Sequence, residues 1–302
     1  MPIEGSLTIK DIYQIMVGYQ QSQIMYTACS LNVFDVLHKA NDGMTSDVLA
    51  NRIRSEPEAV DRLLNACVGI GLVDVHMDAN GIATYSNTTA TEMFLTNSSA
   101  MSIKTLCLMQ GDFYKIWGRL SMAVKDGSCQ MPLAIGTGCD MFEKGSGFHA
   151  SEEKQYSFMQ CMHMFSRMDS PHVVEAFDLS EFDTACDLGG NFFQDPLPRV
   201  DLFVLSHVIH DWNEEKINLL LSNVYKALRP GGALLLCEKM LQPLKDGPMN
   251  TLLFDIGMLL SSEGKERTTD EYRTLLLQNG FTDIQVKQLP EMCFRDVIMA
   301  RK

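Results

Sequence analysis

The sequence predicts an α/β fold, with a mainly parallel sheet in the C-terminal part and a mainly helical domain before it. The central observation is segment 201–238, where an apolar run, a helical stretch and a second apolar run follow one another. Apolar runs of this length, bounded by turn residues, are typical of buried parallel strands. A strand, a helix and a strand in this order form one βαβ unit.

Titratable side chains follow the carboxyl ends of both expected strands. His207, His210 and Asp211 come directly after the first apolar run, and Glu238 ends the second. Asn213 is suited to cap the helix between the strands. Ligands of open α/β sheets bind outside the carboxyl ends of the strands, so we expect the functional site at this edge.

Composition excludes several classes of protein. The chain has 302 residues, of which 46% are hydrophobic and 21% are charged, and its formal net charge is −13. Such an acidic chain is a poor partner for nucleic acid. Nine cysteines without a C-x-x-C pair predict reduced thiols. With no apolar signal region and no run of membrane-spanning length, we expect a cytoplasmic protein that binds no membrane.

The N-terminal hundred residues have a winged-helix pattern. Residues 8–40 are expected to be helical, with more apolar surface than one small domain can bury, which favours a homodimer. Two short helices follow, and then a hairpin around residues 78–81. Such domains can bind DNA, but the second short helix offers only Arg62 as a cation. A dimerising role is therefore favoured over a DNA-binding regulator.

Residues 101–175 are expected to form a helical connector that is rich in methionine. Core filling explains these methionines better than a pliable lining for a flat apolar ligand. The next strand is expected to end at Asp187, and the glycines that follow it are typical of a nucleotide-binding turn. The last part is expected to contain a helix at residues 250–261, a polar loop at 262–267 and a capped helix at 268–278. An antiparallel hairpin at the sheet edge is expected at residues 282–300.

Two histidines three residues apart, His207 and His210, raise the question of a metal site. No third ligand follows at a suitable spacing, so we expect no zinc here.

Four ordered motifs carry a resemblance to a known family: AFDLSEF with CDLGG, DPLP with VLSHVIHDW, LRPGG with CE, and SEGKERT. With these motifs the chain resembles the small-molecule O-methyltransferases that use S-adenosylmethionine, most of all their acetylserotonin branch. The likeness covers nearly the whole chain. It implies a winged-helix dimerisation domain at 1–100 and a methyltransferase domain at 101–302, in which a helical connector precedes a Rossmann-like sheet at 176–302.

The resemblance also implies a reaction and its site. His210 matches the general base that removes the proton of a phenolic acceptor, and Glu238 and Glu263 match the carboxylates that flank this base. A phenol with a pKa of about 10 is a poor nucleophile at neutral pH, so a neighbouring imidazole suits the chemistry. The acceptor would be a small aromatic molecule similar to N-acetylserotonin, near Asp211, Gly257 and Ser261. The positions matched to the S-adenosylmethionine site are Asp187, Gly189, Gly190, Asn191, Phe192 and His207.

The sequence departs from the family directly after the glycine turn. Only residues 191–200 separate Gly190 from the next expected strand, whereas a βαβ crossover needs about thirty residues. We therefore expect a sheet truncated after its first strand, which becomes an edge strand. The cofactor site would lack a helix and the acid that holds the ribose. The chain could then be weakly active, or it could serve as a non-catalytic dimerisation partner of a complete enzyme.

Smaller departures concern residues near the ligands. The acetylserotonin branch usually has Asn and Gln at the positions of Gly257 and Ser261, and an Arg at the position of His207.

Overall fold

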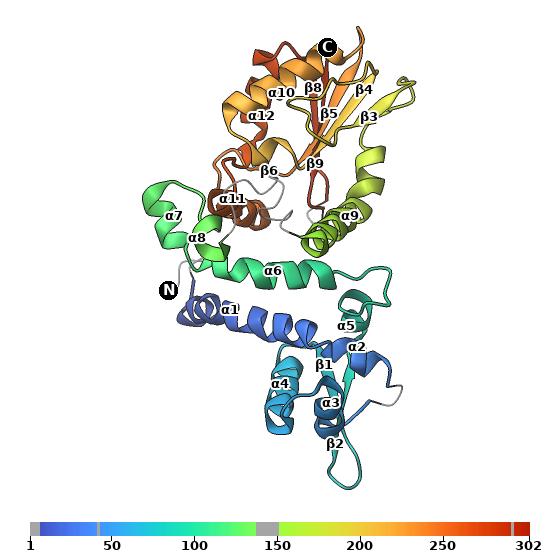
Figure 1. Cartoon of the computed structure of the whole chain (residues 1–302), viewed down its shortest axis with the longest axis vertical. Coiled ribbons are helices and arrows are strands. Elements are labelled where there is room, and N and C mark those ends of the chain that lie inside the picture. Colours follow the sequence, from blue (N-terminus) through green and yellow to red (C-terminus); the bar gives the residue numbers. More distant parts are fainter. Residues whose placement is uncertain (1–6, 41–42, 137–150, 291–292) are drawn as a thin grey trace. The chain divides into compact units, whose positions relative to one another are not determined.

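The computed structural model describes residues 7–40, 43–136, 151–290 and 293–302 (Figure 1). The chain divides into two compact units, Met1–Tyr114 and Lys115–Lys302. This division falls later in the chain than the expected domain boundary after residue 100.

The first unit has the helix, helix and hairpin order expected of a winged-helix domain. Its longest helix, α1 (Ile9–Ser30), begins with a capping box in which Thr8 and Asp11 satisfy each other's backbone N–H groups. The hairpin strands pair antiparallel, with Val75 opposite Tyr85. The other elements are α2 (Val33–His38), α3 (Ser46–Ile53), α4 (Pro57–Gly69), β1 (Val73–Met77), β2 (Ala83–Asn87) and α5 (Thr89–Phe94). Helix α6 (Lys104–Trp117) begins in the first unit and ends in the second.

Helix α1 leaves much apolar surface uncovered within its own unit. Of its 22 residues, only Ala28 and Cys29 are buried. Large apolar side chains along its first three turns are more than half exposed, among them Ile9, Ile12, Tyr13, Ile15, Met16 and Tyr19. A continuous apolar face of this kind indicates an interaction surface.

The second unit is built around a five-stranded sheet in the order β3-β4-β5-β9-β8 (Figure 1). Strands β3, β4 and β5 run parallel, and β9 is antiparallel to its neighbours β5 and β8. The hairpin at the sheet edge is therefore confirmed. Strand β3 forms the opposite edge, as expected from the short link after it. The strands are β3 (Ala185–Asp187), β4 (Leu202–Ser206), β5 (Ala233–Glu238), β8 (Thr282–Lys287) and β9 (Asp296–Arg301).

Both faces of this sheet are covered, which explains the unbroken apolar runs of β4 and β5. On one face, Phe203 and Leu234 pack with apolar residues of α10 (Glu214–Ala227) and α12 (Thr269–Gln278). On the other face, Leu202 and Leu235 pack with the end of α9 (Glu152–Glu175). Each fully buried Leu or Phe stabilises the unit by about 1.5–3 kcal/mol.

The remaining elements of the second unit are two short strands and three helices. Two short strands, β6 (Met240–Leu241) and β7 (Arg267–Thr268), pair in parallel. Helix α11 (Met249–Ser261) lies between them in the chain, and α7 (Leu120–Asp126) and α8 (Met131–Ile135) precede α9. The described cysteines are free thiols. In the part of the chain that the structure describes, no helix is long and apolar enough to cross a membrane.

Candidate active site

His210 lies in a tight turn that begins where β4 ends. The backbone turns at His207, which has a φ of 52° and whose N–H donates to the carbonyl of Cys237 at 3.1 Å. Glu238 then holds the next residues, because its Oε1 accepts hydrogen bonds from the N–H groups of Val208 (2.9 Å) and Ile209 (2.7 Å). Residues 209–211 form one turn of 3₁₀-helix. The carboxyl end of β5 thus fixes the backbone that carries His210.

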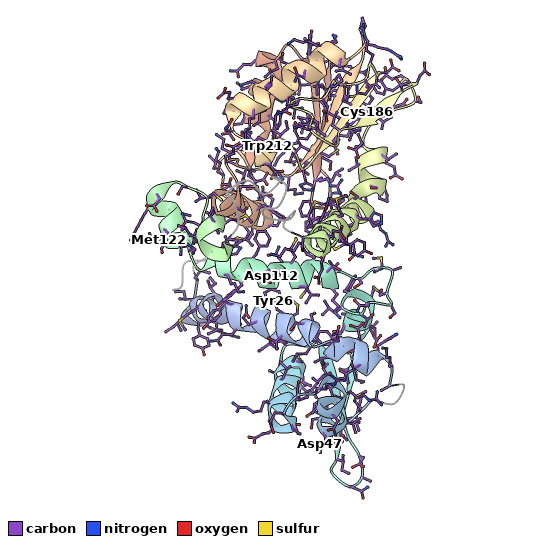
Figure 2. The ribbon with its side chains drawn as sticks, viewed as in Figure 1. Tyr26, Asp47, Asp112, Met122, Cys186 and Trp212 are labelled. Carbon is purple, nitrogen blue, oxygen red and sulfur yellow. The ribbon has the colours of Figure 1, made fainter. Side chains whose placement is uncertain are left out.

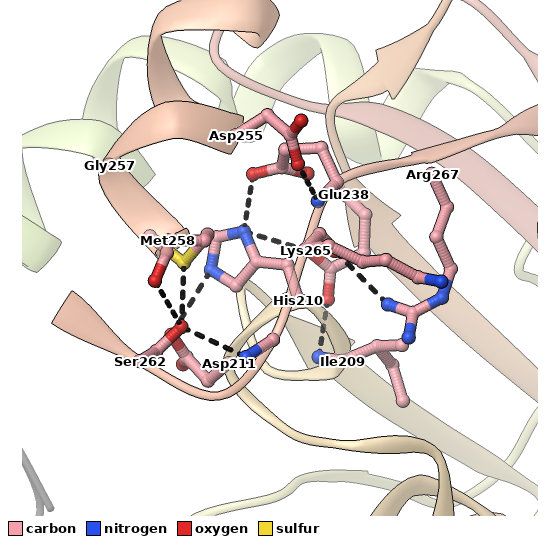
Figure 3. Close-up of polar contacts among 12 residues, drawn as sticks. Ile209, His210, Asp211, Glu238, Asp255, Gly257, Met258, Ser262, Lys265 and Arg267 are labelled. Atoms are coloured by element: carbon pink, nitrogen blue, oxygen red, sulfur yellow. Dashed lines mark hydrogen bonds and ion pairs between the residues drawn. The ribbon is translucent and has the colours of Figure 1, made fainter. Parts of the chain in front are cut away.

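Three carboxylates surround the imidazole of His210 (Figure 3). Nδ1 of His210 lies 2.7 Å from Oε1 of Glu266 and 3.7 Å from Oε2 of Glu238. Nε2, on the other side of the ring, lies 3.7 Å from Oδ1 of Asp211. All four residues are buried. With the proton on Nδ1 donated to Glu266, Nε2 is left as a proton acceptor.

Burial and mutual charge shift the pKa of each group in this cluster. Burial alone would lower the pKa of His210, but Glu266, Glu238 and Asp211 together raise it well above its ordinary value. Burial raises the pKa of Asp211 to about 6 and that of Glu238 to about 7, and the nearby imidazole opposes both shifts. The three carboxylates therefore stabilise the imidazolium that forms when His210 takes up a proton.

The glutamate that contacts His210 in the polar loop is Glu266, which corrects the expectation for Glu263. The Glu263 carboxylate accepts from Lys216 at 2.5 Å and from Asn213 at 2.9 Å, and its side chain is 41% exposed. The parallel pairing of β6 with β7 sets Met240 beside Arg267. Glu266, one residue before Arg267, is therefore brought next to the end of β5.

The polar loop packs tightly against the turn that carries His210. A side chain at Gly264 would overlap the carbonyl oxygen of His210 and would come within 2.6 Å of the carbonyl carbon of Asp211. Asp255 on α11 accepts the backbone N–H of Glu266 at 2.8 Å and so fixes the loop from the other side. Gly264 is thus required here by close backbone approach.

Two of the residues matched to the acceptor lie on α11. A side chain added at Gly257 would meet no atom within 4 Å, so there is open space beside this position. The hydroxyl of Ser261 is buried and donates to the carbonyl of Gly257 at 2.7 Å. The third, Asp211, contacts His210 as described above.

The glycine turn after β3 has few atoms close to its backbone. Gly190 has a φ of 76°, which favours glycine, and a side chain at Gly189 would meet no atom within 4 Å. Burial raises the pKa of Asp187, and the charge of Arg295 opposes this shift. The backbone at this turn is therefore open to a ligand.

The link after the turn folds back onto the sheet without forming a helix. The N–H of Asn191 donates to Oδ2 of Asp195 at 3.2 Å. The ring centroids of Phe192 and Phe193 lie 4.8 Å apart. The ring of Phe193 also packs edge-on against Trp212, with 5.0 Å between the centroids (Trp212 is labelled in Figure 2). These two rings pack against the core that α10 and α12 cover. Aromatic packing thus joins this link to that core.

Comparison with known proteins defines the class of this fold and site. A model described as the O-methyltransferase domain matches residues 188–282, and one described as the O-methyltransferase dimerisation domain matches residues 13–97. The chain belongs to the S-adenosylmethionine-dependent O-methyltransferases and is of the acetylserotonin O-methyltransferase type. It is therefore an enzyme of a family whose cofactor is S-adenosylmethionine, and the dimerisation domain supports a homodimer.

Several of the similar proteins are acetylserotonin O-methyltransferases. That of Gallus gallus is 33% identical over 340 residues, with 96% of each chain covered, and that of Homo sapiens is 31% identical over 333 residues, with 94% of this chain and 95% of the relative covered. The structure of human N-acetylserotonin methyltransferase in complex with SAM has a TM-score of 0.92 at 30% identity. That match covers 100% of this chain and 99% of the human one.

The length of the Gallus gallus match agrees with a missing internal segment. It spans 340 positions, whereas this chain has 302 residues, so at least 38 positions (340 − 302) have no counterpart here. The residues present fit S-adenosylmethionine in part. The open glycine turn suits close backbone contact with the cofactor, but among the described residues no strand lies outside β3 to carry an acid for its ribose.

Proposed function

We propose that the chain transfers a methyl group from S-adenosylmethionine to the phenolic hydroxyl of a small aromatic acceptor, with N-acetylserotonin as the first candidate. The observation that carries this proposal is the buried imidazole of His210, which has Nδ1 2.7 Å from a carboxylate and Nε2 available as a base. The candidate acceptor comes from the relatives, which are acetylserotonin O-methyltransferases at 31–33% identity.

The chain's own residues would act on the proton of the acceptor. S-adenosylmethionine supplies an electrophilic methyl group on its sulfonium sulfur. Transfer to the acceptor oxygen would break the bond between this methyl group and sulfur and leave S-adenosylhomocysteine, and Nε2 of His210 would accept the hydroxyl proton. Glu266 and Glu238 then stabilise the imidazolium that forms, because both carboxylates face Nδ1. The space beside Gly257 would admit part of the acceptor. As part of the same proposal, we infer that the protein acts in the cytoplasm.

Transfer of a labelled methyl group tests the proposal. The full chain, with millimolar S-adenosylmethionine, should methylate N-acetylserotonin and leave the analogue without the ring hydroxyl unmethylated. His210→Ala should lower turnover by about 10²–10⁴-fold, the usual contribution of a general base. Turnover that survives in His210→Ala, or methylation of the analogue, would contradict this mechanism.

A second candidate function is favoured by the truncated sheet. Strand β3 lacks an outer neighbour among the described strands, while the dimerisation-domain model matches residues 13–97. The chain could therefore pair with a complete enzyme and regulate it without catalysing the reaction. Absence of methyl transfer at millimolar S-adenosylmethionine, together with a stable dimer, would support this role.

A further inference from the structure

Three metal-ligating side chains meet at the carboxyl edge of the sheet. His207 and His210 follow β4, Glu238 ends β5, and one ligand atom of each residue lies within 4.8 Å of the other two. Along the chain the two histidines had no third partner at a suitable spacing. The third residue comes instead from the neighbouring strand, whose parallel pairing sets Cys237 beside Ser206.

Two of these three residues carry buried ligand atoms that have no hydrogen-bond partner. Among the described residues, Nε2 of His207 and Oε2 of Glu238 are both buried and accept or donate no hydrogen bond. Buried polar atoms in proteins nearly always have a hydrogen-bond partner, and a buried atom without one is unfavourable. The proposed general base accounts for Glu238 through His210, whereas Nε2 of His207 has no hydrogen-bond partner among the described residues.

The charges around the three residues favour a cation. Asp211 and Glu266 add two buried carboxylates beside the imidazole of His210. The nearby cation is Arg295, whose guanidinium donates to Ser206 at 3.0 Å. Arg295 also faces the buried carboxylate of Asp169 at 3.4 Å, which offsets its charge.

We propose that His207, His210 and Glu238 form a binding site for a divalent transition metal ion, with Zn²⁺ as the best match. Two imidazoles and one carboxylate are a common zinc ligand set, and they leave a fourth position open. Bonds of about 2.0–2.1 Å place tetrahedral ligands roughly 3.4 Å apart, so the side chains must approach one another by about an ångström on binding.

Zinc at this site would inhibit the enzyme. An imidazole whose lone pair binds a metal cannot accept the proton of the acceptor. This consequence rests on the proposed function, whereas binding of the metal does not, and the two can be measured separately.

Titration calorimetry with Zn²⁺ on the chelator-treated full chain tests the site. We expect one bound ion per chain, and a parallel titration with Mg²⁺ should give no binding because this hard ion prefers oxygen ligands. His207→Phe, which keeps an aromatic ring, and Glu238→Gln, which keeps an oxygen for the turn, should each weaken Zn²⁺ binding at least tenfold. Even the loss of a residue that only hydrogen-bonds to a metal ligand lowers metal affinity about 10–100-fold. His163→Ala, on the exposed surface of α9, is the matched control.

Co²⁺ provides the second measurement, because its absorption distinguishes nitrogen and oxygen ligands from the chain's free thiols. We expect the visible absorption bands of tetrahedral Co²⁺ and no thiolate charge-transfer band. The visible bands should weaken in His207→Phe. Circular dichroism checks that each variant is folded. Zn²⁺ affinity that is unchanged in both site variants, or a thiolate band, would overturn the proposal. Zn²⁺ binding without inhibition of methyl transfer would overturn only its functional consequence.

Discussion

Replacement of Glu266 by Gln is the most informative perturbation of the site. It removes one negative charge and leaves the size of the side chain nearly unchanged. In the native chain, Oε1 of Glu266 lies 2.7 Å from Nδ1 of His210, and its side chain is 1% exposed. The contact is therefore shielded from solvent, and its loss should act directly on the base.

The expected magnitude follows from this geometry. A hydrogen bond to a charged group contributes about 1.5–3 kcal/mol, and it is strongest when the imidazolium forms. Each 1.36 kcal/mol changes a rate about tenfold, so turnover should fall roughly 10- to 150-fold. The Michaelis constants should change much less, because the contact strengthens as the proton arrives on His210.

Glu263→Gln is the matched control in the same loop. Glu263 pairs with Lys216 at the surface, where both side chains are about 40% exposed. Surface ion pairs of this kind contribute about 0–1 kcal/mol, so turnover should stay within about twofold. Transfer of labelled methyl from millimolar S-adenosylmethionine, at saturating acceptor, measures both variants. Equal losses in the two variants, or a larger loss in Glu263→Gln, would refute our assignment of Glu266.

Three other predictions concern the loop, the cofactor and the dimer. Gly264→Ala should lower the free energy of unfolding by about 1–3 kcal/mol and reduce turnover, because the added methyl group displaces the backbone of His210. Urea unfolding and the methyl-transfer assay measure the two effects, and unchanged values would show that the loop can move aside. The dissociation constant for S-adenosylmethionine should be in the millimolar range. Loss of two charge-assisted contacts, at about 1.5–3 kcal/mol each, weakens a micromolar site by roughly two to four decades. Low-micromolar binding by calorimetry would show that residues 191–195 rebuild the site. Replacing Ile12 and Ile15 on the exposed face of α1 by Asp should convert the homodimer to monomer in sedimentation, and an unchanged dimer would place the interface elsewhere.

Patterns of neighbouring residues predict several local elements and the position of His210. Asn213 caps α10 by accepting from Lys216 at 3.0 Å, and the capping box of Thr268 and Glu271 begins α12, both as their spacing predicts. The apolar run before His207 forms strand β4, so His210 comes to the carboxyl edge of the sheet. The ten residues after Gly190 were too few for a crossover helix, and β3 is accordingly an edge strand. Each of these features depends on residues that are close in the chain.

Pairing between distant segments sets which side chains contact His210. Glu263 and Glu266 lie in one polar loop, and nothing in their local pattern indicates which of them is buried. The pairing of β6 with β7 makes that choice, because it joins segments about 27 residues apart and brings Glu266 to the end of β5. The approach of Glu238 to His207 likewise depends on strand pairing across a helix. Register between distant segments is set by how the whole core packs, and sequence spacing therefore cannot reveal it.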